Sequence, residues 1–554
     1  MRITSQTHRA RTAGLAVGAL LATTVLTATT TGSVSAAPVI STKDPVGGGW
    51  GNLATADPTT FTITETLKAL ETGKYTSVDL TKAYLARIDI YEPYYNAFTQ
   101  MNPNALADAA ASDARRKKSR KDVGPLEGVP IVIKDSMDVK GMPTTSGWPL
   151  TSPISGGVSL VPEADAPAVK RLRDAGAIII GKTNLPILAG SGSNANNSAY
   201  GPTYNALNQG WAPGGSSSGS ATSVAGDFAV AGMAEETGGS IQNPGSAQSL
   251  YAVKPTFGLV PSTGNFPLQG LTRDVLGPLA KSVEDAAIMM DVLAGYSAED
   301  PKTEGAVVPA GGYTSQLSTH ALEGKRIGLY GAGWRVGNNS VLSPETAELY
   351  AEAVAHLEEQ GATVVEDPFA GSGFSALRTA GGSTGGGNSW AIQQYLGRLG
   401  PSAAVHSIEE LNTWADANGF EGDTRINNMV TGLSTPLDLA PFLANRDNYL
   451  RIFGEVMEAH DLDALVFPQQ VAEVGPIFGG SVAASTVSEI NVSQLPGVVV
   501  PDGAYASGKP FNLIMLDEKW SEAELLGYAY DYAEAYGGRI VNRDLSTTPG
   551  PTAP

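Results

Sequence analysis

The sequence predicts an α/β fold in which a parallel or mixed sheet is covered by helices. Two short apolar runs rich in β-branched residues, Gly128–Lys134 and Ala177–Ile180, are typical of buried strands. Between them, Ala168–Ala175 has the pattern of a helix that starts with Asp165 and Pro167 and ends at Gly176. This order of strand, helix and strand favours strands that lie in one sheet beneath helices.

The N-terminus has the pattern of a secretory signal peptide. Three arginines among the first eleven residues precede an apolar run, Leu15–Leu26, and a small-residue cleavage site ends at Ala36. We therefore expect residues 1–36 to direct export by the general secretory route and to be cut between Ala36 and Ala37. A retained membrane anchor is the alternative, which the shortness of the apolar run disfavours.

The elements after the leader are predicted from caps, periodicity and apolar runs. Residues 37–61 are expected to form a surface extension. A capping box of Thr62 and Glu65 begins a short helix, and a second helix near Thr76 places Leu80, Tyr84 and Ile88 on one face. Further elements are expected as helices at Asn104 to Arg116, from Ser343, and Glu522–Ala535, and as strands at Tyr251–Val260, Lys325–Tyr330, Ala362–Val365, Asp463–Phe467 and Gly497–Val500.

Two segments are expected to lack regular structure. Gly371–Gly387 is rich in glycine and serine and predicts a long loop, and residues 546–554 predict a disordered tail. Residues 62–545 remain as one domain.

The composition is that of an acidic globular protein. The 554 residues are 42% hydrophobic and 16% charged, with a formal net charge of −19 and no cysteine. Such acidity argues against nucleic acid or an anionic membrane as a partner held by general electrostatics. Because cysteine is absent, the chain has neither disulfides nor thiolate metal ligands.

Two loops of small residues in the segment Pro213–Pro244 are the centre of the predicted chemistry. Gly214–Ser220 and Thr237–Ser240 are rich in serine and glycine and flank a helix-capable run and an apolar run. Such loops present hydroxyls and bare backbone N–H groups, as a nucleophile and its oxyanion donors require. A flexible Gly/Ser linker is disfavoured, because both loops adjoin long apolar runs.

Lys134 is the candidate base because it ends an apolar, buried strand. Burial disfavours an ammonium ion, so a neutral amine able to accept the proton of a nearby serine is expected there. A structural salt bridge from Lys134 to Asp135 or another acid is the alternative. Lys182 ends a similar strand between less apolar neighbours and is the second candidate.

Two other classes of hydrolase are disfavoured. Gly215–Gly219 matches the G-x-S-x-G elbow of Ser-His-Asp enzymes, but the preceding residues are loop-like and end in Pro213, where that motif needs a strand. No histidine lies near the serine loops in sequence, and no pair has HExxH spacing. We therefore expect neither a metal nor a cofactor.

These motifs, in this order, resemble the amidase signature family. The matching segments are Gly128–Asp135, Gly181–Asn184, Gly214–Ser220, Thr237–Ile241, Lys254–Thr256, Leu495–Gly497 and Val500–Pro501. The resemblance extends from about Thr62 to Arg539. It implies a single α/β domain, with a large mixed sheet between layers of helices, that hydrolyses amide C–N bonds.

The resemblance also implies a Ser–cisSer–Lys triad. Ser240 is the expected nucleophile, Lys134 the base, and Ser216, with a cis peptide bond to the next residue, the proton relay between them. The backbone N–H groups of Ser240 and of the loop before it form the expected oxyanion hole, at Thr237, Gly238 and Gly239. Substrate binding is assigned to Ser217, Gly190 and Ser191.

Two departures from the family pattern limit the choice of substrate. Most members have Asp and Arg where this chain has Glu236 and Gln242. Among members, the chain is most similar to secreted peptide amidases, which act on C-terminal peptide amides, so the expected partner is a peptide or small-molecule amide, without nucleic acid or stable membrane association. The alternatives are an aryl acylamidase or esterase, a non-catalytic amide-binding protein and a glutamyl-tRNA amidotransferase A-like subunit.

Overall fold

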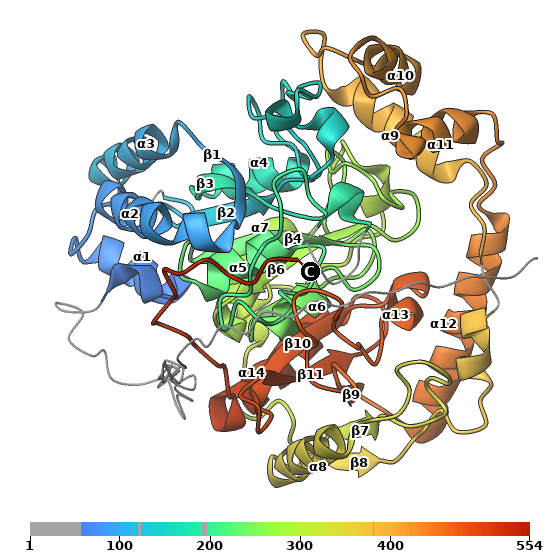
Figure 1. Ribbon diagram of the computed structural model, residues 1–554. Helices are drawn as coiled ribbons and strands as arrows, with labels where there is room; N and C mark the ends of the chain where they lie inside the picture. The colour runs from blue at the N-terminus through green and yellow to red at the C-terminus, as the bar shows by residue number, and fades with distance from the viewer. Residues whose placement is uncertain (1–56, 120–122, 191–196, 380–381, 554) are drawn as a thin grey trace, which may run out of the picture. The chain divides into compact units, whose positions relative to one another are not determined.

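One mixed sheet of eleven strands runs through the described part of the chain (Figure 1). The computed structural model describes residues 57–119, 123–190, 197–379 and 382–553. In sheet order the strands are β1 (Phe98–Met101), β3 (Ile178–Thr183), β2 (Pro130–Lys134), β4 (Ala231–Glu236), β6 (Val275–Ala280), β5 (Tyr251–Lys254), β10 (Gly497–Ala504), β11 (Pro510–Leu516), β9 (Ala464–Pro468), β7 (Arg326–Leu329) and β8 (Thr363–Val365).

The strand directions confirm the predicted mixed sheet. Strands β3, β2 and β4 are parallel, as are β9, β7 and β8. The remaining neighbours are antiparallel. Every residue of β2 and β3 is buried, as expected for parallel strands covered on both faces.

Helices cover the sheet and also form a group away from it. They are α1 (Ile63–Glu71), α2 (Ser77–Tyr95), α3 (Ala105–Lys118), α4 (Pro167–Asp174), α5 (Ser218–Ala225), α6 (Gln242–Ala247), α7 (Val283–Leu293), α8 (Pro344–Glu359), α9 (Gly387–Arg398), α10 (Ile408–Ala417), α11 (Thr424–Leu433), α12 (Ala440–His460), α13 (Ser488–Val492) and α14 (Glu522–Tyr536). Helix α5 packs on β2 and β4, α7 on β6, and α14 on β10, whereas α9, α10 and α11 pack on one another (Figure 1).

Helix starts follow the predicted capping chemistry. The capping box of Thr62 and Glu65 is formed at the start of α1, and Ser343 caps α8 through the N–H of Thr346. The predicted cap of α4 is wrong, because the Asp165 carboxylate accepts the N–H of Lys140 and makes no cap hydrogen bond.

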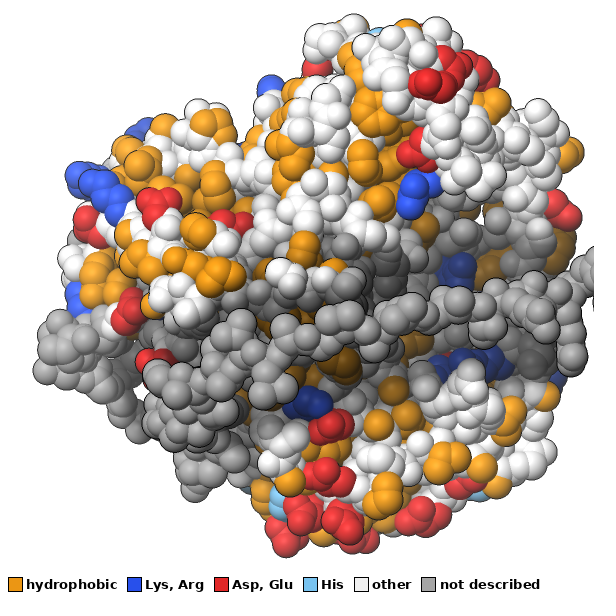
Figure 2. Space-filling view, in the orientation of Figure 1, with side chains coloured by type: hydrophobic (Ala, Val, Ile, Leu, Met, Phe, Trp, Pro, Cys, Tyr) orange, Lys and Arg blue, Asp and Glu red, His pale blue; other side chains and the backbone are white. Residues whose placement is uncertain are grey.

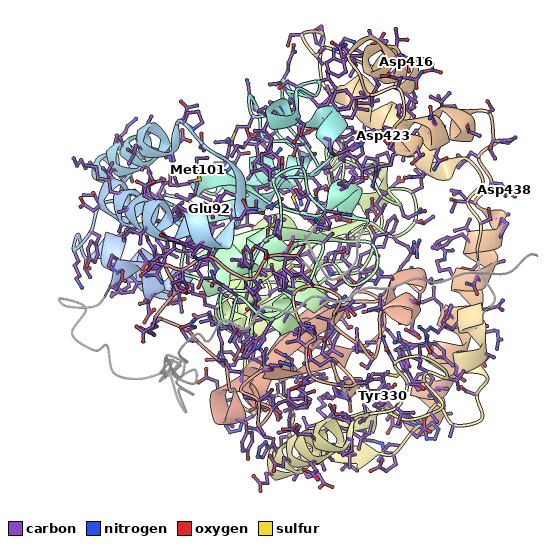
Figure 3. The ribbon with its side chains drawn as sticks, in the orientation of Figure 1. Glu92, Met101, Tyr330, Asp416, Asp423 and Asp438 are labelled. Carbon is purple, nitrogen blue, oxygen red and sulfur yellow. The ribbon has the colours of Figure 1, made fainter. Side chains whose placement is uncertain are left out.

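Two partly buried carboxylates link segments by hydrogen bonds other than those between strands. The carboxylate of Glu92 in α2, labelled in Figure 3, accepts the N–H groups of Ala97 and Phe98 at 2.9 and 2.8 Å, and so fixes the turn into β1. Asp423, at the start of α11, accepts the indole N–H of Trp148 at 2.6 Å. This bond ties the α9–α11 group to the segment that follows β2.

Several predicted boundaries differ from the structure. The extended segment after Tyr251 ends at Lys254, and Gly371–Gly387 contains a 3₁₀ segment, Phe374–Thr379, rather than only loop. This segment is ordered because Phe374 is buried against Trp334, with ring centroids 4.6 Å apart. Strands β1, β6 and β11 and helices α6, α7 and α9 to α13 were not predicted.

The structure describes the C-terminal end of the chain as far as residue 553, but the N-terminal end only from residue 57. The predicted signal peptide, and the extension as far as residue 56, lie outside the described residues. Residues 546–553 lack helix and strand, and the backbone carbonyls of Thr548 and Pro551 accept hydrogen bonds from Gln209 and Tyr204. Among the described residues, no helix combines the length and apolar character needed to span a bilayer.

Candidate active site

The two serine loops and Lys134 meet at the carboxyl ends of the neighbouring parallel strands β2 and β4. Lys134 is the last residue of β2, and β4 ends at Glu236, directly before the loop Thr237–Ser240. The strands are in register, with Ile133 opposite Met233, so the ends lie side by side. In open α/β sheets, reacting groups gather at such carboxyl ends.

Lys134 contacts Ser216 inside the protein. Its Nζ donates to Ser216 Oγ at 2.7 Å, to the Glu235 carbonyl at 3.0 Å and to Glu235 Oε2 at 2.5 Å. Lys134 and Ser216 are fully buried. Burial lowers the pKa of Lys134 below its usual value, and the Glu235 carboxylate opposes this shift. The site therefore holds an amine that can exchange a proton with Ser216.

The structure separates Lys134 from the second candidate lysine. Lys182 Nζ lies 2.7 Å from Asp135 Oδ1 and donates to Thr144 Oγ1 and to a backbone carbonyl. The alternative partner considered for Lys134, Asp135, is thus engaged by Lys182. Lys134 instead contacts Glu235, so the alternative of a salt bridge from Lys134 to another acid is present in the structure beside the contact with Ser216.

The first serine loop lies against helix α6, which follows the second loop. A Cβ at Gly214 would lie 2.5 Å from the carbonyl oxygen of Asn243, three residues after Ser240, so only glycine permits this approach. Ser240 is 5% exposed, and within the described part of the chain its hydroxyl makes no hydrogen bond. The structure therefore joins Lys134 to Ser216, while the expected hydrogen bond from Ser216 to Ser240 is not formed.

A cis peptide bond lies in the first loop, but not where it was expected. It joins Gly215 to Ser216, before the serine, and not Ser216 to the next residue. The predicted position is therefore wrong by one bond. The difference is local, because both positions lie within the same loop and involve Ser216.

The second loop presents unpaired backbone donors. Within the described residues, none of the four N–H groups from Thr237 to Ser240 donates a hydrogen bond. Gly239 has φ 99°, a conformation that favours glycine, and Gly238 is exposed. Unpaired N–H groups beside a serine hydroxyl can stabilise an oxyanion that forms on a bound carbonyl group.

The buried carboxylate of Glu236 anchors the end of this loop through four hydrogen bonds. Its Oε2 accepts the N–H groups of Ile241 and Gln242 at 2.8 and 3.1 Å. Its Oε1 accepts the side-chain amides of Gln242 and, at 2.7 Å, of Asn491 in α13. The two residues that depart from the family pattern, Glu236 and Gln242, thus contact each other directly, as an acid and an amide.

The residues assigned to substrate binding have different surroundings. Ser217 is fully buried, and its hydroxyl donates to the Glu235 carbonyl at 3.2 Å, so it supports the end of β4. Gly190 is exposed at the end of the 3₁₀ turn Ile187–Ala189. Ser191 lies outside the described residues.

Sequence reasoning missed Glu235 and Asp274 next to the base, and it assigned Thr237 only a backbone role. Thr237 Oγ1 lies 2.8 Å from Glu235 Oε1 and 2.6 Å from Asp274 Oδ1. Burial, with Glu235 nearby, raises the pKa of Asp274 to about 6. The available signal was the pair of acids, Glu235 and Glu236, that ends an otherwise apolar strand.

Neither the strand that should precede a Ser-His-Asp elbow nor a histidine partner is found at this site among the described residues. Ser217 precedes α5 but follows a loop and not a strand. His356 stacks on Tyr536, and His406 lies beside Glu410. The described residues contain no group of three or more His, Cys, Asp or Glu side chains arranged to hold a metal ion.

Comparison with known proteins points to one family. The family model described as Amidase matches residues 79–526. The A-type subunit of the glutamyl-tRNA(Gln) amidotransferase from Chloroflexus aggregans is 33% identical over 487 residues, covering 85% of this chain and 96% of that protein.

Solved structures agree as well. The peptide amidase of Stenotrophomonas maltophilia is 29% identical with a TM-score of 0.71, covering 87% of this chain and 98% of that one. An amidase family protein of Bacillus anthracis is 26% identical with a TM-score of 0.69, covering 86% and 91%. The chain therefore belongs to the amidase signature family, whose members act on amide C–N bonds.

Proposed function

We propose that this protein is an exported serine amidase that hydrolyses a carboxamide through an acyl-enzyme on Ser240. The observation that carries the proposal is the buried contact of 2.7 Å between Lys134 Nζ and Ser216 Oγ, directly beside the loop of unpaired N–H groups that ends at Ser240. A base, a relaying hydroxyl and oxyanion donors are the parts that acyl transfer requires.

The proposed reaction moves one proton along three side chains. The neutral amine of Lys134 accepts the proton of Ser216 as Ser216 takes that of Ser240, whose oxygen attacks the amide carbonyl. The N–H groups of the Thr237–Ser240 loop bind the oxyanion. Ser216 then protonates the leaving nitrogen, and water releases the acyl group by the reverse route. The relay requires a hydrogen bond between the two serines that forms with substrate bound, because catalytic contacts are often longer without substrate.

A C-terminal peptide amide is the substrate class that we favour. The similarity to a peptide amidase over most of both chains supports it.

The test combines substrate and variant. The purified protein should release ammonia from C-terminally amidated peptides, and a fluorophosphonate probe should label Ser240. Ser240→Ala should abolish both signals, and Ser216→Ala or Lys134→Ala should lower kcat/KM by about 10³-fold or more. Ser155→Ala, at an exposed serine, is the matched control and should leave both unchanged. Turnover that survives Ser240→Ala contradicts the proposal.

A second candidate is a component that acts within an amidotransferase. The identity of 33% to an A-type amidotransferase subunit over nearly its whole length favours it. The two candidates differ in what the isolated chain does. Release of ammonia from peptide amides without any partner supports the amidase, whereas activity on glutamine that appears only with partner subunits supports the amidotransferase. A secreted protein that begins at Ala37 would support the proposed export.

A further inference from the structure

Three side chains beside Lys134 have no part in the Ser–Ser–Lys reaction. The carboxyl group of Glu235 contacts Lys134 directly, with 2.5 Å between Oε2 and Nζ. Thr237 Oγ1 lies between the two carboxyl groups, 2.8 Å from Glu235 Oε1 and 2.6 Å from Asp274 Oδ1. All three residues are buried, with at most 5% of their surface exposed.

Counting hydrogens shows that this cluster holds a proton. A threonine hydroxyl has one hydrogen, so Thr237 can donate to only one of its two carboxyl oxygens. The other carboxyl, at hydrogen-bond distance from the same oxygen, must donate to it and must therefore be protonated. The remaining contacts of Asp274 leave this choice open, because its two oxygens accept the N–H groups of Leu268 and Gln269, both at 2.8 Å.

We infer that Glu235 and Asp274 share one proton through the Thr237 hydroxyl, and that this shared proton allows Lys134 to remain an uncharged amine ready to accept the proton of Ser216. The inference rests on the proposed function. Glu235 and Asp274 are positioning residues in this scheme, because they act on the substrate only through Lys134.

The two positions of the proton have different consequences for the base. When the proton is on Asp274, Thr237 donates to Glu235, which is a carboxylate and favours an ammonium at Lys134. When it is on Glu235, Thr237 donates to Asp274, and a neutral carboxyl group faces a neutral amine. A third arrangement, with the proton on Lys134 and both carboxyls ionised, places three charges in the interior and brings two like charges together, which burial disfavours.

Other charged groups around the cluster do not remove the need for the shared proton. Lys134 is also near Glu236, whose carboxylate already accepts four hydrogen bonds. Arg273 adjoins Asp274 in sequence, and Lys254 faces Glu236. Burial raises the pKa of Asp274 to about 6 and lowers that of Lys134, so both groups are shifted toward their uncharged forms.

The test measures kcat/KM against pH and follows the acidic limb of this profile, which is the range where kcat/KM rises with pH. Activity requires unprotonated Lys134, so kcat/KM rises with pH through an apparent pKa of the whole cluster. Asp274→Asn leaves Glu235 as a permanent carboxylate beside Lys134, which should move the limb to higher pH by about 1–3 units. Glu235→Gln removes the charge that holds the ammonium, which should move the limb to lower pH. Asp461→Asn, at an exposed residue, should not move it.

The same limb should appear in the rate at which a fluorophosphonate labels Ser240, which reports the nucleophile without turnover and counts only folded sites. Opposite shifts for the two variants support the inference. If the limb moves in the same direction in both variants, or if activity falls equally at every pH without a shift, the inference is overturned. Glu235 and Asp274 then have only a structural role. A wild-type protein that neither turns over amides nor is labelled contradicts the proposed function itself, and the inference with it.

Discussion

Glu236 shows how one side chain can hold a reactive loop in place. Its carboxylate accepts two backbone N–H groups and two side-chain amides, and it is fully buried. Both N–H groups belong to the residues directly after Ser240. Since the carboxylate only accepts, it matches four donors at once, which an amide cannot do.

Replacing this carboxylate by an amide should therefore loosen the nucleophile loop. In Glu236→Gln one end of the side chain becomes a donor, so at least one buried donor loses its acceptor, at a cost of about 1–3 kcal/mol. We expect a lower melting temperature by calorimetry and a fall in kcat/KM on the order of 10- to 100-fold. Glu304→Gln, at an exposed glutamate, is the control. An unchanged kcat/KM in Glu236→Gln would show that the loop does not depend on this carboxylate.

Single functional residues could be predicted where a sequence motif contains them. They could not be predicted where residues distant in sequence meet only in the folded structure. The motifs brought Lys134 and Ser216 to one site, and the 2.7 Å contact agrees. The roles of Glu235 and Asp274 were missed because the two acids are distant in sequence and meet only through the Thr237 hydroxyl. No spacing rule describes such a meeting.

Helix α5 shows what positions the first serine loop at the scale of an element. The helix begins at Ser218, and its second residue, Gly219, donates its N–H to the Asn184 carbonyl at 3.0 Å. A Cβ at Gly219 would collide with the Ala97 carbonyl and lie 2.5 Å from Asn184 N. The helix can approach this backbone only because position 219 lacks a side chain.

Adding one methyl group should push the helix away from this contact. Since both colliding groups are backbone, Gly219→Ala should destabilise the fold by about 1–3 kcal/mol or more and displace Ser216, lowering activity even where the protein stays folded. Chemical denaturation and kcat measure the two effects. The matched control is Gly305→Ala, where a Cβ meets nothing within 4 Å. Equal stability of the two variants would mean that α5 shifts without cost.

Elements were predictable in proportion to how regular their sequences are. Strands β2 and β3 each contain a continuous run of β-branched apolar residues, and α1 and α8 have explicit caps, so all four were found. Strand β6 has the sequence VLGPLA, in which Gly277 and Pro278 disguise a strand. It is nonetheless in the sheet because β4 and β5 pair with it on both sides, a tertiary effect that no local pattern reports.

The order of the strands is a property of the whole molecule. Strands β10 and β11, from the C-terminal part of the chain, lie between β5 and β9. The sequence predicted a mixed sheet correctly, but local patterns contain no information on which distant strands pair. The active site depends on one such pairing, because β2 and β4 carry its two halves and are adjacent in the sheet although β3 lies between them in the chain.

Acidic charge also acts on the whole molecule. The formal net charge is −19, and Figure 2 shows acidic side chains gathered over α8 and α10. Inside the protein, burial is the largest cause that raises the pKa of several carboxyls: to about 7 for Glu92, Asp285 and Asp502, and to about 6 for Asp138 and Asp274.

These raised values fix the sign of the pH dependence of stability. Between about pH 4, where such groups titrate in the unfolded chain, and pH 7, the folded protein binds more protons than the unfolded one. Their contribution is therefore fully present at low pH and is lost as pH rises through the folded values. The pKa values of three other carboxyls are lowered: Asp79, Glu163 and Glu473. Their contribution to stability grows as pH rises, but it does so below this pH range.

We therefore expect the protein to be more stable at pH 5 than at pH 8. Each raised pKa unit of a buried group corresponds to about 1.4 kcal/mol, and repulsion among the ionised carboxylates adds to the loss. Melting temperatures measured by calorimetry across this range should fall by several degrees. Asp285→Asn should flatten the slope, because it removes one of the buried groups that must ionise, whereas a melting temperature that rises from pH 5 to pH 8 would mean that these carboxyls are already ionised in the folded protein at pH 5.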